Sequence, residues 1–252
     1  MSFVQTMILG TISGLTILLG MPIARLKVKV KEHVAFLNAL AIGVLFFLFF
    51  DIIKNATEPI ETAVKNHSNS IWLLMGILII GFGVGLLSLV YYGKHFLSKK
   101  KGISPQQLAL LIAMGIGLHN FSEGLAIGNA AHSGELSFAL LLIVGFSLHN
   151  ITEAFGIAAP LTGQRTSWKF LVLAGLIGGG PNLFGTLIGY RLTSEPLSIL
   201  FLALASGAIM YVIGELLAAG RKFSAHTWNG WGLAIGFFAG LLTDFILMAA
   251  GT

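Results

Sequence analysis

The chain has 252 residues, of which 56% are hydrophobic and only 10% are charged. Because about a quarter of the residues in a soluble domain are charged, this composition excludes an ordinary soluble protein and indicates a polytopic membrane protein. The absence of cysteine excludes disulfides and thiolate metal sites, and the formal charge of +5 is better explained by membrane topology than by a nucleic-acid partner.

Eight apolar segments are each long enough to cross a hydrocarbon core, which needs about 20 helical residues. We expect them to form one all-α transmembrane domain over residues 1–252. They lie near 3–24, 34–53, 71–93, 106–131, 137–161, 169–190, 196–219 and 229–250.

The basic residues are distributed unequally between the two sides of this arrangement. One side has only Lys54, Lys65 and Arg191. The other twelve of the 15 lie on the opposite side: Arg25, Lys27, Lys29, Lys31, Lys94, Lys99, Lys100, Lys101, Arg165, Lys169, Arg221 and Lys222. The positive-inside rule therefore predicts that the second side is cytoplasmic and that both termini are extracytoplasmic.

The sixth segment contains Gly178-Gly179-Gly180-Pro181 near its middle. Proline lacks the N–H that a helix needs, so we expect the helix to break there. A broken membrane helix is tolerated only where it faces protein or a wet cavity. The next residue, Asn182, is thus a candidate neighbour of a functional site.

A polar motif occurs twice in otherwise apolar sequence, as Leu-His-Asn-Phe-Ser-Glu-Gly over 118–124 and Leu-His-Asn-Ile-Thr-Glu-Ala over 148–154. The i, i+4 spacing places each histidine over its glutamate on a helix. At about 1.5 Å per residue both motifs fall near the bilayer midplane, and the short 132–136 connection makes their helices antiparallel neighbours. Buried polar groups of this kind indicate a functional site.

Imidazole, carboxylate and amide oxygen together suit a divalent ion such as zinc, iron, manganese or cadmium. The candidate ligands are His119, Asn120, Glu123, His149, Asn150 and Glu153. Three further acids lie in apolar surroundings and are candidates for the transport path or for support of the site: Asp51, close to the predicted end of its segment, Glu215 and Asp244.

His-Asn-Phe-Ser-Glu-Gly-Leu-Ala-Ile-Gly in the fourth segment, with His-Asn-Ile-Thr-Glu-Ala in the fifth, resembles the ZIP family of divalent-metal transporters. The resemblance implies inward transport of zinc or a similar ion across the cell membrane, a homodimer, and an elevator-like movement of segments one, four, five and six against the others. It implies that the six motif residues are ligands or their immediate partners, with metal as the substrate and no prosthetic group.

The chain departs from the family pattern in two places that bear on the metal. Some members complete a second adjacent metal site with a glutamate in the sixth segment, where this chain has Gly-Gly-Pro-Asn. Gly214 stands where a histidine often precedes the acid that Glu215 matches. These departures speak against a two-metal centre and predict a weaker cytoplasmic exit site.

Two other functions are compatible with the same side chains. A membrane-embedded metal-dependent hydrolase would need an open coordination position and a general base. The chain contains no His-Glu-x-x-His pattern, so we expect that it is not an enzyme. A proton-coupled carrier of a small organic solute would use the carboxylates without a metal, and metal uptake into vesicles distinguishes it.

Overall fold

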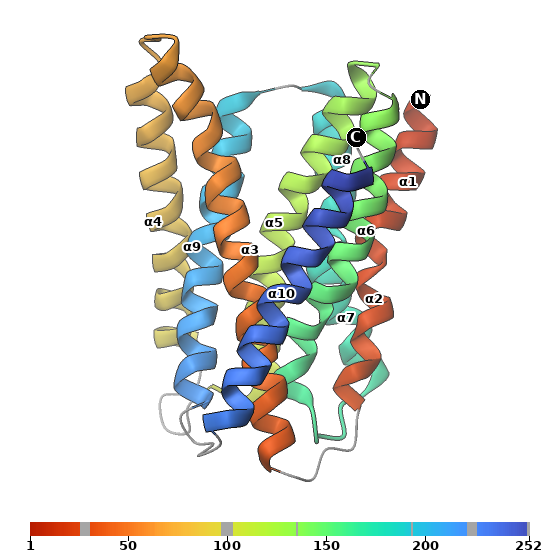
Figure 1. The fold of residues 1–252 in the computed structure, drawn as a ribbon, viewed down its shortest axis with the longest axis vertical. Helices are drawn as coiled ribbons and strands as arrows, with labels where there is room; N and C mark the ends of the chain where they lie inside the picture. The colour runs from red at the N-terminus through yellow and green to blue at the C-terminus, as the bar shows by residue number, and fades with distance from the viewer. Residues whose placement is uncertain (26–30, 97–102, 135, 193, 221–225, 251–252) are drawn as a thin grey trace.

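The protein is a bundle of long helices. The computed structural model describes residues 1–25, 31–96, 103–134, 136–192, 194–220 and 226–250, and within these ranges every regular element is helical. The predicted all-α class is therefore confirmed. In Figure 1 the N and C labels lie at the same end of the bundle. The helices are α1 (Phe3–Leu15), α2 (Ile17–Gly20), α3 (Lys31–Lys65), α4 (Ile71–Phe96), α5 (Pro105–His132), α6 (Leu136–Ala158), α7 (Trp168–Gly179), α8 (Pro181–Arg191), α9 (Glu195–Gly220) and α10 (His226–Ala250).

Seven stretches of the described residues are long and apolar enough to cross a membrane. They correspond to the first seven predicted segments. α10 matches the eighth predicted segment but is not one of the seven, so its crossing remains a prediction. The seven are Phe3–Arg25, Ala35–Lys65, Ile71–Tyr91, Pro105–His132, Leu142–Leu161, Trp168–Arg191 and Glu195–Ala218.

Two interruptions shape the helices near the motifs. The predicted break in the sixth segment is present, since α7 ends at Gly179 and α8 begins at Pro181. A second interruption at Thr16 separates α1 from α2. The Thr16 hydroxyl donates to the carbonyls of Ser13, at 2.6 Å, and Ser147, at 2.8 Å. This second contact joins the first segment to α6, the helix that carries the second motif.

α3 is longer than the sequence predicts. Its expected segment ended at residue 53, whereas the helix continues through Pro59 to Lys65. The added turns bury Ile60 and Ala63 in a small cluster with residues of α4 and α9. Asp51 is consequently in the interior of a helix rather than near its end.

Close backbone packing divides the helices into two bodies. We call α1, α2, α5, α6, α7 and α8 the motif body, and α3, α4, α9 and α10 the flanking body; in Figure 1, α4 and α9 lie apart from α1 and α8. Within each body, glycines allow backbones to approach closely. A Cβ added at Gly14 would clash with the carbonyl of Gly179, and one at Gly85 would clash with that of Leu204.

Glycines at the boundary between the two bodies are less tightly packed than many of those inside each body. A Cβ added at Gly115 of α5 would lie 3.6 Å from Ala208 of α9, and one at Gly156 of α6 would lie 3.8 Å from Leu45 of α3. Both are ordinary van der Waals separations. Among the described glycines, those that meet another residue's backbone at less than 3.0 Å do so within their own body.

Candidate metal site

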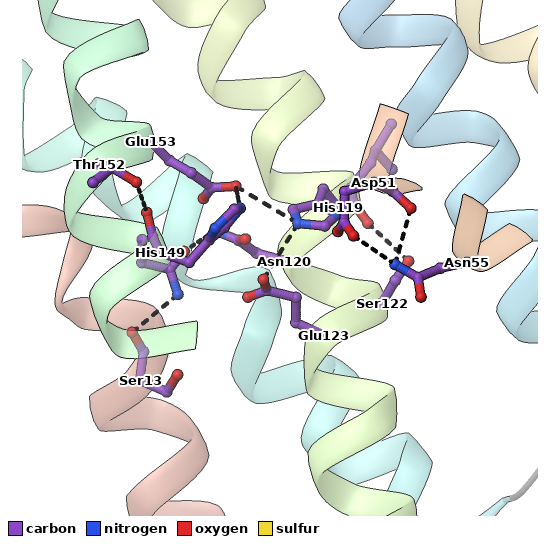
Figure 2. Close-up of polar contacts among 12 residues, drawn as sticks. Ser13, Asp51, Asn55, His119, Asn120, Ser122, Glu123, His149, Thr152 and Glu153 are labelled. Carbon is purple, nitrogen blue, oxygen red and sulfur yellow. Dashed lines mark hydrogen bonds and ion pairs between the residues drawn. The ribbon is translucent and has the colours of Figure 1, made fainter. Parts of the chain in front are cut away.

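The two motifs meet at one level between α5 and α6. Within each helix the histidine contacts the glutamate one turn later: His119 Nε2 lies 3.3 Å from Glu123 Oε1, and His149 Nε2 lies 3.5 Å from Glu153 Oε1. His119 Nε2 also lies 3.7 Å from Glu153 Oε1, across the helix pair. Figure 2 shows these four side chains pointing toward one another.

The separations fit a bound transition-metal ion. Atoms of His119, His149 and Glu153 that could bind a metal all lie within 4.8 Å of one another. Ligands about 2.0–2.1 Å from a tetrahedral zinc ion are about 3.3 Å from each other. The observed contacts of 3.3–3.7 Å are close to that value, so an ion could be bound with small side-chain adjustments.

The four side chains are buried, and most of their polar atoms lack hydrogen bonds. Their residues are between 0% and 7% exposed. Among the described residues, the buried side-chain atoms without a hydrogen-bond partner include His119 Nδ1 and Nε2, His149 Nε2, Glu123 Oε2 and both Glu153 oxygens. An isolated polar group costs several kcal/mol in such a setting. A cation bound among these atoms would offset that cost, which makes the cluster a fitting site for a metal substrate.

The two motif asparagines face a different set of partners. Asn120 Nδ2 donates to Asn150 Oδ1 at 2.6 Å and to the Gly178 carbonyl at 3.1 Å. Asn150 Nδ2 donates to the Ser13 carbonyl at 3.2 Å. Both polar atoms of Asn150 thus take part in hydrogen bonds that join α1, α5 and α6, and its prediction as a ligand or an immediate partner of the ligands stays a prediction. Asn120 Oδ1 has no hydrogen-bond partner among the described residues and remains a possible ligand.

Asn182, at the start of α8, packs against Gly124 of α5, the residue that follows Glu123. It is fully buried, and its Oδ1 is 3.3 Å from the Thr186 hydroxyl. Its Nδ2 has no hydrogen-bond partner among the described residues. An amide N–H group cannot bind a cation. Asn182 was predicted as a neighbour of the site and not as a ligand, and that role stays a prediction.

The three additional acids are in different places. Asp51 of α3 lies beside the cluster in Figure 2 and interacts electrostatically with His119 and Glu123. Glu215 is half-buried in the later part of α9, away from the motifs. Asp244 belongs to α10, and the placement of its side chain lies outside the described part of the structure. Of the two acids whose side chains the structure describes, Asp51 lies at the site and Glu215 does not.

Sequence reasoning missed the contacts that hold the motif helices in place. The carbonyls of Ser13 and Gly178 accept hydrogen bonds from the motif amides, although neither residue type suggests this role. The break before Pro181 was the available signal for Gly178, since carbonyls near a helix break are free to bind side chains. No comparable signal in the sequence identifies Ser13.

The comparisons with known proteins agree with this arrangement. Residues 92–250, more than half of the chain, match the family described as ZIP zinc transporter, and this range includes both motifs. The search of curated proteins gives no match. Members of the matched family are transporters and not enzymes, which confirms that expectation. The chain therefore belongs to the ZIP zinc transporter family, and it is an integral membrane protein that transports divalent metal ions.

Proposed function

We propose that this transporter carries zinc into the cytoplasm through a single site formed by His119, Glu123, His149 and Glu153. The observation that supports this assignment is the convergence of buried nitrogen and oxygen atoms that lack hydrogen bonds. Two carboxylates balance the charge of one divalent ion, and two imidazoles favour a borderline transition metal over magnesium or calcium. Iron, manganese and cadmium are accepted by the same ligand types.

The inward direction of transport is taken from the family resemblance, and the orientation of the chain is taken from its basic residues. Twelve of the 15 basic residues belong to one predicted side, which the positive-inside rule assigns to the cytoplasm. The tip between α3 and α4 lies at the same end of the bundle as both termini in Figure 1. We assign that end to the extracytoplasmic side of the cell membrane.

We propose that the motif body moves as a unit against the flanking body, in an elevator-like manner. Interlocked backbones within each body resist internal sliding, whereas ordinary van der Waals contacts such as that of Gly115 with Ala208 leave a smoother boundary between the bodies. The four proposed ligands all belong to the motif body, so the ion would travel with it. The proposed homodimer rests on the family resemblance.

Metal uptake by purified protein in liposomes tests this function. With zinc, manganese, iron, cadmium, magnesium and calcium supplied separately, zinc should accumulate at least about tenfold faster than magnesium or calcium. Repeating the measurement with and without a pH gradient determines whether protons influence transport. Rates no higher than those of empty liposomes for every transition ion, with correctly folded protein, would overturn the proposal.

A further inference from the structure

A shallow groove of about 450 Å³, which we call the α7 groove, runs along the outer face of α7. Its lining residues follow the spacing of one helix face. The four large apolar side chains among them are 44–54% exposed, so the rest of the described chain leaves them uncovered. The lining consists of Trp168, Lys169, Val172, Leu173 and Leu176.

The α7 groove lies where one leaflet of the bilayer contacts the protein. α7 is the first part of Trp168–Arg191, one of the stretches that can cross a membrane. The helix begins at Trp168, and tryptophan favours the level of the lipid headgroups. The helix from Trp168 to Leu176 extends about 12 Å, close to the half-thickness of about 15 Å of a hydrocarbon core. A lipid chain that begins beside Trp168 can therefore follow the groove through most of one leaflet.

Arg25 lies over the headgroup end of the groove. Its guanidinium carbon is 4.9 Å from the centroid of the Trp168 ring, a cation–π contact. Arg25 ends the short helical turn Met21–Arg25, so this contact joins the end of the first segment to the start of α7. Stacking uses the face of the guanidinium and leaves the N–H groups in its plane available as donors. That planar set of donors matches the oxygen atoms of a phosphate group.

The surroundings of this end of the groove are positively charged. Arg25, Arg165 and Lys169 are exposed, and among the described residues no ion pair joins any of them to a carboxylate. Neither residues 1–31 nor residues 154–194, the stretches that contain these three cations, include an aspartate or a glutamate. Such an excess of positive charge at the membrane surface attracts anionic lipid.

A second groove of similar size lacks this combination. It has a volume of about 460 Å³ and lies at the end of the bundle that carries both termini in Figure 1. Its lining has no lysine or arginine and consists of Met1, Gln5, Ile8, Leu9 and Leu140. Both grooves can contact lipid chains, but of the two it is the α7 groove that has basic side chains at its headgroup end.

We propose that the α7 groove binds one anionic phospholipid of the cytoplasmic leaflet. The phosphate lies between Arg25 and Lys169, and one acyl chain lies along Val172, Leu173 and Leu176. A second copy of the chain fits less well, because a two-fold contact through this face would place the same cations against each other. α7 belongs to the motif body, so the lipid is attached to the body that carries the metal ligands.

Tryptophan fluorescence tests the site, because Trp168 lines the groove. A variant with Trp72→Phe, Trp228→Phe and Trp231→Phe keeps Trp168 as its single tryptophan. In phosphatidylcholine liposomes with about a tenth of the lipid brominated, phosphatidylglycerol as the brominated lipid should quench Trp168 at least about threefold more than brominated phosphatidylcholine. Equal quenching by the two lipids would overturn the proposal. Quenching by neither would overturn it as well, because another molecule would then cover the groove.

The matched control keeps Trp231 as the single tryptophan. Trp231 is 62% exposed near the start of α10, at the same end of the bundle but in the flanking body. Among the described residues, the arginines that stack on rings do so on Trp168 and Phe3 and not on Trp231. Quenching of Trp231 should therefore be the same for both brominated lipids. A preference as large as that of Trp168 would contradict a specific site.

Substitution of the two cations tests the headgroup contacts. In the variant that keeps Trp168, Arg25→Gln together with Lys169→Gln should abolish the preference for the anionic lipid. Lys94→Gln removes an exposed charge from α4 at the same end and should leave the preference unchanged. An undiminished preference in the Arg25→Gln, Lys169→Gln variant would contradict the proposed contacts. These measurements do not use zinc, so their failure would leave the proposed transport function intact.

Discussion

Zinc uptake should fall at least about 100-fold when Glu123 and Glu153 are both replaced with alanine. The two carboxylates are the only acids among the proposed ligands, and without them a divalent ion would be buried beside neutral imidazoles. An uncompensated charge in such surroundings costs several kcal/mol, and every 1.4 kcal/mol corresponds to a tenfold change in binding. Initial uptake rates in proteoliposomes measure this loss.

The control for this double substitution must separate lost binding from lost folding. Glu61→Ala removes an exposed carboxylate from α3 and should retain the wild-type rate. The double variant should keep the helix content of the wild type by circular dichroism, which shows that lost uptake is not lost folding. Wild-type uptake by a folded double variant would exclude these residues as ligands.

His119→Ala should mainly weaken zinc binding, whereas Asn120→Ala should mainly lower the stability of the fold, although the two residues are adjacent. His119→Ala removes a proposed ligand and should weaken zinc binding at least about 100-fold, since even the partners of metal ligands are worth 10–100-fold. Asn120→Ala leaves Asn150 Oδ1 and the Gly178 carbonyl without their donor. It should lower the free energy of unfolding by about 1–3 kcal/mol. Zinc titration and thermal unfolding of both purified variants give the two quantities.

The two variants are compared by their losses of zinc affinity and of unfolding free energy. Asn120 Oδ1 could still contact the ion, so some loss of affinity in Asn120→Ala is acceptable. An affinity loss in Asn120→Ala that equals or exceeds the loss in His119→Ala would contradict the prediction that the histidine is the stronger ligand. Unchanged stability in Asn120→Ala would show that its two hydrogen bonds do not hold the helices together.

The features that could be predicted from sequence depend on residues close together in the chain. Segment lengths follow from bilayer thickness, and the break before Pro181 follows from its missing N–H. The i, i+4 spacing placed each histidine over its glutamate, and the short connection between α5 and α6 made the motifs antiparallel neighbours. These rules bring His119, Glu123, His149 and Glu153 together without knowledge of the other helices.

The features that escaped prediction depend on contacts between distant segments. The apolar segment of α3 was expected to end at residue 53, but the helix continues to Lys65 and packs Ile60 and Ala63 against α4 and α9. That extension changes the position assigned to Asp51. The use of both polar atoms of Asn150 likewise depends on Ser13, which is 137 residues away in the chain.

Anomalous scattering from zinc in crystals of the metal-loaded protein tests the location of the site most directly. Data collected on both sides of the zinc absorption edge should give one strong peak between α5 and α6, about 2.0–2.2 Å from His119 Nε2, His149 Nε2 and carboxylate oxygens of Glu123 and Glu153. The peak should be absent from the folded Glu123→Ala, Glu153→Ala double variant. A strong peak elsewhere, with none between the two motifs, would contradict the proposed site.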